Sequence, residues 1–112
     1  SESYMLMQET LWESGQKPQW WSNASESYES KTLSSGSQIM ARYFEVELDY
    51  LELENLYFRF EQGLIEADHW LGAKALLRSF LYDPFRRAVF LDRSSSLTEI
   101  IVVLVAEIEG AE

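Results

Sequence analysis

The feature that most constrains this chain is a row of apolar residues that repeats at helical spacing through its middle. The row consists of Ile39, Tyr43, Val46, Tyr50, Leu53, Tyr57 and Phe60. Intervals of four and three residues separate its members, which is the period of an α-helix with one buried face. No glycine or proline interrupts the sequence before Gly63. We therefore predict one helix of about 25 residues over 37–62, roughly 38 Å long at 1.5 Å per residue.

Capping signals mark both ends of this predicted helix. Ser35 stands three residues before Gln38, which is capping-box spacing. Gly63 is placed to take the left-handed conformation just past the last turn. Further apolar residues that widen the row are Met40, Phe44, Leu51 and Phe58. Carboxylates on the other face, which we expect to be solvated, are Glu45, Asp49 and Glu52.

Four shorter helices are predicted around the long one. They cover residues 4–13, about 66–81, 84–93 and 97–108. Asp83 followed by Pro84 gives the third an N-cap and a first residue, and Ser96 with Glu99 forms a second capping box at the start of the last. The β-branched run 100–106 is also compatible with a buried strand. A lone strand would leave its backbone groups unpaired, so we predict a helix there.

The chain of 112 residues has the length of one domain. We predict the all-α class: a small helical bundle built on one long central helix with about four shorter helices. Residues 1–36 form a serine-rich helix and loop segment, and residues 37–109 form the helical core. Within the first segment, 16–37 is expected to be mostly loop.

Two adjacent tryptophans, Trp20 and Trp21, lie in this polar loop. They must either dock on the core or form a binding surface, and the usual burial of tryptophan favours docking. Four short helices leave part of the long helix uncovered, and uncovered apolar patches mark interfaces. We therefore expect a homodimer or a protein partner, against the alternative that the tryptophan loop seals the helix within one monomer. The candidate partner surface consists of Trp12, Trp20, Trp21, Phe44 and Leu51.

Several chemistries lack the residues they need. The chain has no cysteine and one histidine, His69. Glu66 and His69 have the Glu-x-x-His spacing of di-iron bundles, but such a site needs two copies and two further glutamates. A symmetric dimer using Glu54 or Glu61 would be required to complete it. The sequence also lacks a nucleophile elbow and a phosphate-binding glycine loop. We predict no enzyme activity, no metal and no cofactor.

The charge restricts the class of partner. Nineteen acidic and nine basic residues give a net charge of −10, which disfavours direct nucleic-acid binding and favours a basic partner. No apolar run reaches the roughly 18 residues needed to cross a bilayer. We expect a cytoplasmic domain, at the cytoplasmic face of the membrane if the full-length protein is anchored.

Short segments at characteristic positions carry a resemblance. They are Glu54-Asn55-Leu56-Tyr57, Glu61-Gln62-Gly63-Leu64-Ile65, Trp70 and Leu77-Arg78-Ser79. Over residues 37–108 the chain resembles the cytosolic helical domain of an uncharacterised group of small bacterial membrane-anchored proteins. Phe85, Arg86 and Phe90 fit the pattern, whereas Ala88-Val89 departs from it. The resemblance implies a helical fold and a membrane-proximal location, and it brings no catalytic residues.

We interpret the chain as a non-enzymatic protein-interaction domain, the soluble part of a membrane-tethered or complex-forming bacterial protein. One alternative is a small acidic inhibitor of phage type that occupies a basic nucleic-acid-binding site on a partner. A second alternative is a helical-bundle metal or small-ligand enzyme.

Overall fold

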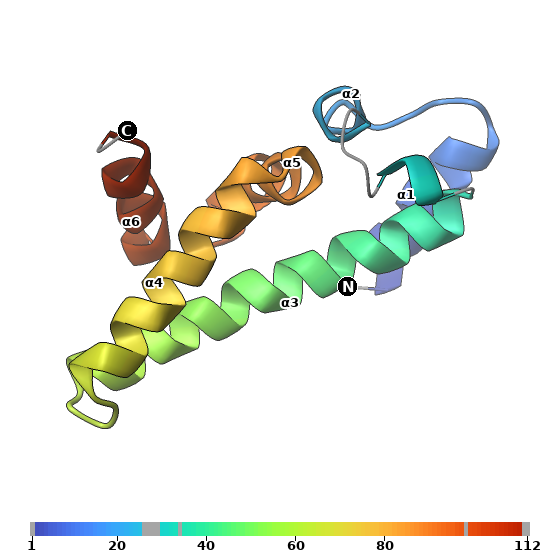
Figure 1. The fold of residues 1–112 in the computed structure, drawn as a ribbon. Coiled ribbons are helices and arrows are strands. Elements are labelled where there is room, and N and C mark those ends of the chain that lie inside the picture. The colour runs from blue at the N-terminus through green and yellow to red at the C-terminus, as the bar shows by residue number, and fades with distance from the viewer. Residues whose placement is uncertain (1, 26–29, 34, 98, 111–112) are drawn as a thin grey trace.

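A computed structural model describes residues 2–25, 30–33, 35–97 and 99–110, and within these ranges the chain is helical without strands (Figure 1). The α-helices are α1 (Glu2–Glu13), α2 (Trp21–Ala24), α3 (Gly36–Glu61), α4 (Ala67–Tyr82), α5 (Pro84–Arg93) and α6 (Glu99–Gly110). Two 3₁₀ turns are η1 (Ser30–Thr32) and η2 (Ser94–Ser96). One long helix with shorter helices packed on it confirms the predicted fold class.

The long helix α3 has the boundaries that its capping signals predict. The Ser35 hydroxyl accepts a hydrogen bond from the backbone N–H of Gln38 at 3.2 Å, which satisfies one of the unpaired donors of the first turn. At the other end Gly63 has a φ of +74°, a conformation that glycine adopts without steric cost. The backbone N–H of Leu64 then donates to the Arg59 carbonyl at 2.9 Å.

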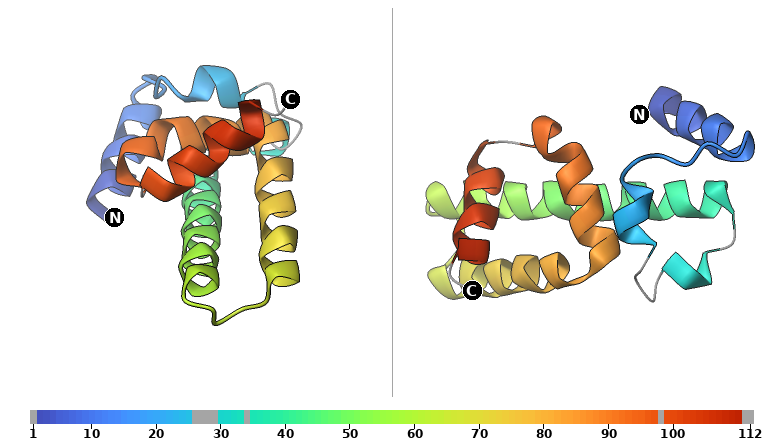
Figure 2. Two further views of the ribbon diagram at one scale, coloured as in Figure 1. Left: turned by 90° about the vertical axis from the view of Figure 1, so that its left-hand side faces the viewer. Right: turned by 90° about the horizontal axis from the view of Figure 1, so that it is seen from above.

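The reversal at Gly63 folds α4 back along α3 as a helical hairpin (Figure 2). Trp70 of α4 joins the two legs: its ring lies 5.1 Å from the Tyr57 ring and stacks on Phe60 at 5.9 Å with an interplanar angle of 15°. Aromatic pairs at these distances add to the energy of burial. The Gln-Gly-Leu turn and its aromatic residues are therefore a structural hairpin.

Helix α5 packs on both α3 and α4 and ties them together with polar contacts. Asp83 caps it, with its carboxylate accepting from the backbone N–H of Arg86 at 2.8 Å. The Tyr50 hydroxyl donates to the Arg86 carbonyl at 2.8 Å. The Arg86 guanidinium pairs with Asp49 at 2.9 Å and lies 4.1 Å from the centre of the Phe80 ring. Asp49, which we expected to be merely solvated, is thus a structural ion-pair partner.

Helix α6 confirms that the β-branched run is helical, with Ile101, Leu104, Val105 and Ile108 buried. The predicted start of this helix directly after Ser96 is wrong, however. Ser96 ends a 3₁₀ turn and Leu97 has an extended backbone with ψ of 157°, so the helix begins at Glu99 and not directly after Ser96. Thr98 lies outside the described residues.

The N-terminal segment docks through its tryptophans. Trp20 is 6% exposed, with its ring 4.9 Å from that of Tyr43 and 5.8 Å from that of Phe85. Trp21 contacts Trp12 edge-on at 5.0 Å. The short helix α2 and the turn η1 interrupt the stretch expected to be loop. Because Trp20 fixes the start of α2 on the core, a segment too short and polar to fold alone acquires a turn of helix there.

Candidate functional site

A second apolar row runs along the outside of α3. Leu48, Leu51 and Phe58 are 64%, 40% and 38% exposed, and Phe44 is half-buried. These four residues are separated by four, three and seven positions. With the exposed residues between and beyond them, they define what we call the outer row: Ala41, Phe44, Leu48, Leu51, Asn55, Phe58 and Gln62.

The spacing of the outer row is that of a coiled-coil seam. Intervals of three and four residues alternate without a break from Ala41 to Gln62, as at the a and d positions of a heptad repeat. Phe44, Leu51 and Phe58 stand at d, and Leu48 and Asn55 stand at a. A strict seven-residue repeat of this kind presents one continuous edge to a neighbouring helix.

The outer row lies on the opposite side of α3 from the core. At 3.6 residues per turn its centre is roughly 160° around the helix from the inner row of Ile39, Tyr43, Val46, Tyr50, Leu53, Tyr57 and Phe60. The first five members of the inner row are buried, and this side of α3 packs on α4 and α5. Helix α1 packs on α3 as well, and Trp12 of α1 lies directly against Gly36 at the start of α3. From Leu48 to Phe58 the outer row remains accessible to a partner.

The positions flanking the outer row are mostly acidic. One flank carries Glu45, Glu52 and Arg59, and the other carries Glu47, Glu54 and Glu61. Most of these carboxylates have partners within the chain: Glu45 pairs with Arg42 at 2.8 Å, Glu47 pairs with Arg93 of α5, and Glu61 hydrogen-bonds with the Tyr57 hydroxyl. Glu54 also interacts within the chain. The flanking positions nearer the C-terminus of α3 bring three further glutamates and one arginine, so the edges of the row keep a negative charge.

The structure divides the residues predicted for a partner surface into two groups. Phe44 and Leu51 belong to the outer row. Trp12, Trp20 and Trp21 form a separate aromatic cluster in which Trp12 and Trp21 are half-buried. Trp20 is covered by Tyr43 and Phe85 and is not a surface residue of the single chain. The sequence interpretation of one widened stripe missed Leu48 and Asn55, although the heptad spacing through Phe44, Leu51 and Phe58 would have identified them.

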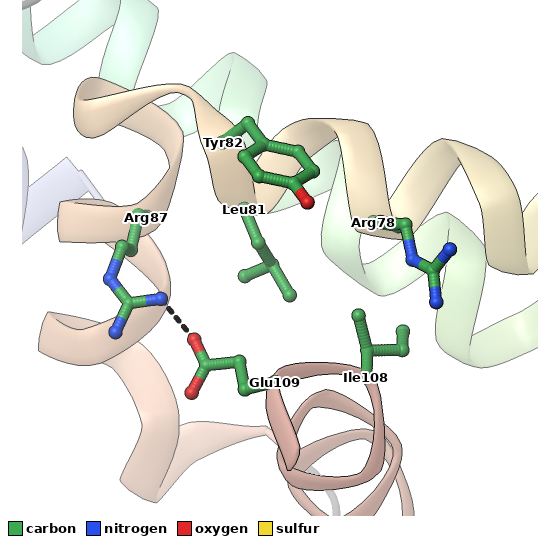
Figure 3. A pocket seen from close by; sticks show the side chains of 6 residues that line it. All are labelled: Arg78, Leu81, Tyr82, Arg87, Ile108 and Glu109. Carbon is green, nitrogen blue, oxygen red and sulfur yellow. Dashed lines mark hydrogen bonds and ion pairs between the residues drawn. The ribbon is translucent and has the colours of Figure 1, made fainter. Parts of the chain in front are cut away.

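A small cleft opens between α4, α5 and the end of α6 (Figure 3). Its volume is about 270 Å³, below the roughly 300–1,000 Å³ typical of small-molecule sites. Described residues that line it are Arg78, Leu81, Tyr82, Arg87, Ile108 and Glu109. An ion pair between Arg87 and Glu109 lies along one side of the cleft, and Arg78 lies on the other side. The cleft therefore combines the apolar side chains of Leu81 and Ile108 with one ion pair and the further guanidinium of Arg78. Among its described lining there is no nucleophile beside a base.

The Glu-x-x-His pair lies at the start of α4, where Glu66 and His69 are exposed. In the described part of the chain no group of three or more histidine, aspartate or glutamate residues is arranged to hold a metal ion. None of the described helices combines the length and the apolar character needed to cross a membrane. No known protein family, curated protein or solved structure gives a significant match to this chain.

Proposed function

We propose that this chain is a non-enzymatic protein-interaction domain that uses the outer row of α3 as its docking surface. The observation that carries the proposal is the heptad spacing of Leu48, Leu51 and Phe58, which are accessible apolar residues on a helix whose other side is already buried. An apolar row of this length on a monomer is typical of an interaction site. Within the outer row Phe44 packs on the core, whereas Leu48, Leu51 and Phe58 are exposed and lie outside it.

We further propose that the domain is the soluble part of a membrane-tethered or complex-forming bacterial protein, acting in the cytoplasm. The support for a tether is the resemblance over residues 37–108 to helical domains of membrane-anchored bacterial proteins. The support for complex formation is the outer row itself. The two are compatible, because a helix face exposed beside a membrane can recruit a second protein.

The proposal is tested by crosslinking in cells of the native host with matched variants. Leu48→Asp/Leu51→Asp places two charges in the outer row. Leu76→Asp/Leu91→Asp makes the same chemical change at exposed sites on α4 and α5. We expect one or more proteins to crosslink to the wild type and to the control variant and to be lost from the outer-row variant. Identical crosslinked species in all three would contradict the proposal.

The acidic flanks of the outer row favour one second candidate, a small acidic inhibitor of a nucleic-acid-binding protein. In that case charge and not apolar contact would dominate binding. Glu52→Gln/Glu54→Gln would then abolish crosslinking while Leu48→Asp/Leu51→Asp left it in place. The crosslinked protein would also bind nucleic acid, in competition with this chain.

A further inference from the structure

We infer that the partner at the outer row is an amphipathic helix of a different protein, with an apolar heptad seam flanked by lysine and arginine. This inference rests on the proposed function and specifies its partner. The juxtaposition that carries it is a heptad row of accessible Leu and Phe residues between two glutamate-rich flanks on a single helix.

The apolar side chains determine that the occupant is a helix. Knobs at a and d positions insert into holes formed by four residues of a facing helix, and an alternating three-and-four spacing fits that geometry. Leu48, Leu51 and Phe58 would be such knobs. Loops or strands do not present holes at this repeat, so an extended peptide would leave part of the row exposed.

The flanks determine the charge of the occupant. Residues at e and g positions pair across a coiled coil and set partner choice. In α3 five of these six positions, from Glu45 to Glu61, are glutamate and one, Arg59, is arginine. With Glu45 paired to Arg42 and Glu47 paired to Arg93, the flanks still keep a net negative charge. Lysine or arginine on the facing helix would be attracted by that charge, whereas an acidic helix would be repelled.

The same charges disfavour a second copy of this chain. In a parallel pair of α3 helices, Glu47 would face Glu52 of the other copy, while Glu54 would face Arg59, so the repulsive and the attractive contact offset each other and the flanks give no net attraction. An antiparallel pair would bring the flank of Glu47, Glu54 and Glu61 against itself. Each chain also carries a net charge of −10, so two copies repel at long range.

Asn55 restricts the register in which a second helix can align with α3. It is exposed at an a position between Leu51 and Phe58, where a buried polar residue lowers stability but fixes alignment and the number of helices. A partner with asparagine in the same layer would satisfy its amide. A shift by one heptad would place Asn55 against an apolar residue and leave the amide unpaired.

The inference is tested with two synthetic helical peptides of three heptads. Fluorescence anisotropy measures the binding of each peptide to the full chain. Both carry Leu at d, Val at a and Asn in the central a layer. One carries Lys at every e and g position and the other carries Glu. We expect the Lys peptide to bind the wild type and the control variant Leu76→Asp/Leu91→Asp with the same affinity. Its affinity for Leu48→Asp/Leu51→Asp should be at least about tenfold lower, which corresponds to about 1.4 kcal/mol of binding free energy.

Charge and register are tested in the same format. Raising the salt concentration from about 0.05 to 0.5 M should weaken the Lys peptide several-fold, because salt screens exposed charge pairs. Moving Asn from the central a layer to the next one should weaken the Lys peptide too, and the Glu peptide should not bind. Equal binding of both peptides, or no binding of either, overturns the inference.

Sedimentation identifies the competing occupant. A concentration-dependent dimer of the wild type that becomes monomeric in Leu48→Asp/Leu51→Asp would show that a second copy covers the row, and the inference would be wrong. If the peptides fail while the cellular crosslinks depend on the outer row, the proposed function stands without this partner. If the cellular crosslinks also ignore the outer row, the proposed function fails as well.

Discussion

The two sides of α3 are built from the same kinds of residue and have opposite surroundings. On the inner side Tyr43 and Tyr50 are 0% and 1% exposed, whereas on the outer side Leu48 and Leu51 are 64% and 40% exposed. Apolar character therefore does not separate a core face from a docking face. What separates them is whether the rest of the chain provides a surface of matching shape and polarity.

Polar complementarity identifies the inner side as the core. Two of its tyrosines bury a hydroxyl, and α5 supplies an acceptor for each: Tyr43 donates to the Asp92 carboxylate at 2.5 Å and Tyr50 to the Arg86 carbonyl at 2.8 Å. A buried hydroxyl without a partner would be costly. The large apolar members of the outer row are Leu and Phe, which have no hydroxyl group, so they need no such acceptors from their own chain.

The strongest test of this contrast is the same substitution at two adjacent positions. Tyr50→Asp places an unpaired carboxylate in the core and removes a large ring, so we expect a loss of about 4 kcal/mol or more in the free energy of unfolding. Leu51→Asp, one residue further on the exposed side, should change it by no more than about 0.5 kcal/mol. Urea denaturation followed by circular dichroism measures both.

Comparable losses at the two positions would show that the outer side is also part of the core of the single chain. A stable Tyr50→Asp variant would instead show that α5 does not cover the inner side in solution. Either result would remove the distinction on which the docking surface depends.

A second test concerns the tryptophans that cover the inner side of α3 near the N-terminal end of this helix. Trp20 packs on Tyr43 and Phe85, and Trp20→Ala should cost about 3 kcal/mol through the cavity that it leaves. Trp21 is half-buried at the edge of the same cluster, so Trp21→Ala should cost clearly less. If the two variants are equally stable, the tryptophan segment is not a part of the core.

Local signals in the sequence predicted the helices well, because helix ends depend on neighbouring residues. The Ser35 cap, the Gly63 reversal and the Asp83–Pro84 start all fall where the sequence places them. Ser96 fails because a serine three residues before a glutamate is compatible with a 3₁₀ turn as well. Whether Ser96 starts an α-helix or ends a 3₁₀ turn depends on how the buried side chain of Leu97 packs on the core. The spacing of neighbouring residues does not contain this information.

The candidate site was predicted only in part, for a related reason. Phe44 and Leu51 were identified as uncovered apolar residues, but they were grouped with Met40, which is fully buried. Separating the two rows requires knowing where α1, α4 and α5 pack, which is a long-range property. The sequence pattern alone indicates that the carboxylates of α3 are solvated, and only the packing of the other helices shows that several of them flank an exposed apolar row.

A third test examines how closely α1 is fixed against α3. A Cβ atom at Gly36 would come 2.5 Å from Trp12 Cγ and 2.8 Å from Trp12 Cβ, so the indole must move. We expect Gly36→Ala to cost about 1–2 kcal/mol, as overpacking typically does, and to change the tryptophan fluorescence of the native state. A Trp12→Ala background removes the ring atoms but keeps the Trp12 Cβ atom, so the same substitution should cost clearly less there. This double-mutant cycle isolates the contact with the indole ring. Additive effects would place α1 elsewhere.

The smallest expected effect is a pH dependence of the free energy of unfolding that comes from Tyr50 on the inner side. Burial, which outweighs the favourable charge of Arg86, raises the pKa of Tyr50 well above its ordinary value of 10.0. In the unfolded chain this tyrosine loses its proton near pH 10, while in the native chain it keeps it. Unfolding therefore releases a proton in alkaline solution, and stability falls as the pH rises above about 10 by up to 1.4 kcal/mol per unit. Below that pH the contribution is fully present.

Tyr50→Phe isolates this contribution. At pH 7 the variant should be less stable than the wild type by about 1 kcal/mol, because the hydrogen bond to the Arg86 carbonyl is lost. Phenylalanine does not titrate, so the difference should shrink from pH 9 upward and vanish between pH 10 and 11. At pH 11, one unit above the ordinary tyrosine pKa, the wild type has lost about 1.4 kcal/mol and the variant should be slightly the more stable of the two. Urea midpoints at pH 7, 9, 10 and 11 measure this directly. A constant difference across that range would mean that Tyr50 titrates normally in the native chain, and hence that water reaches the inner side of α3.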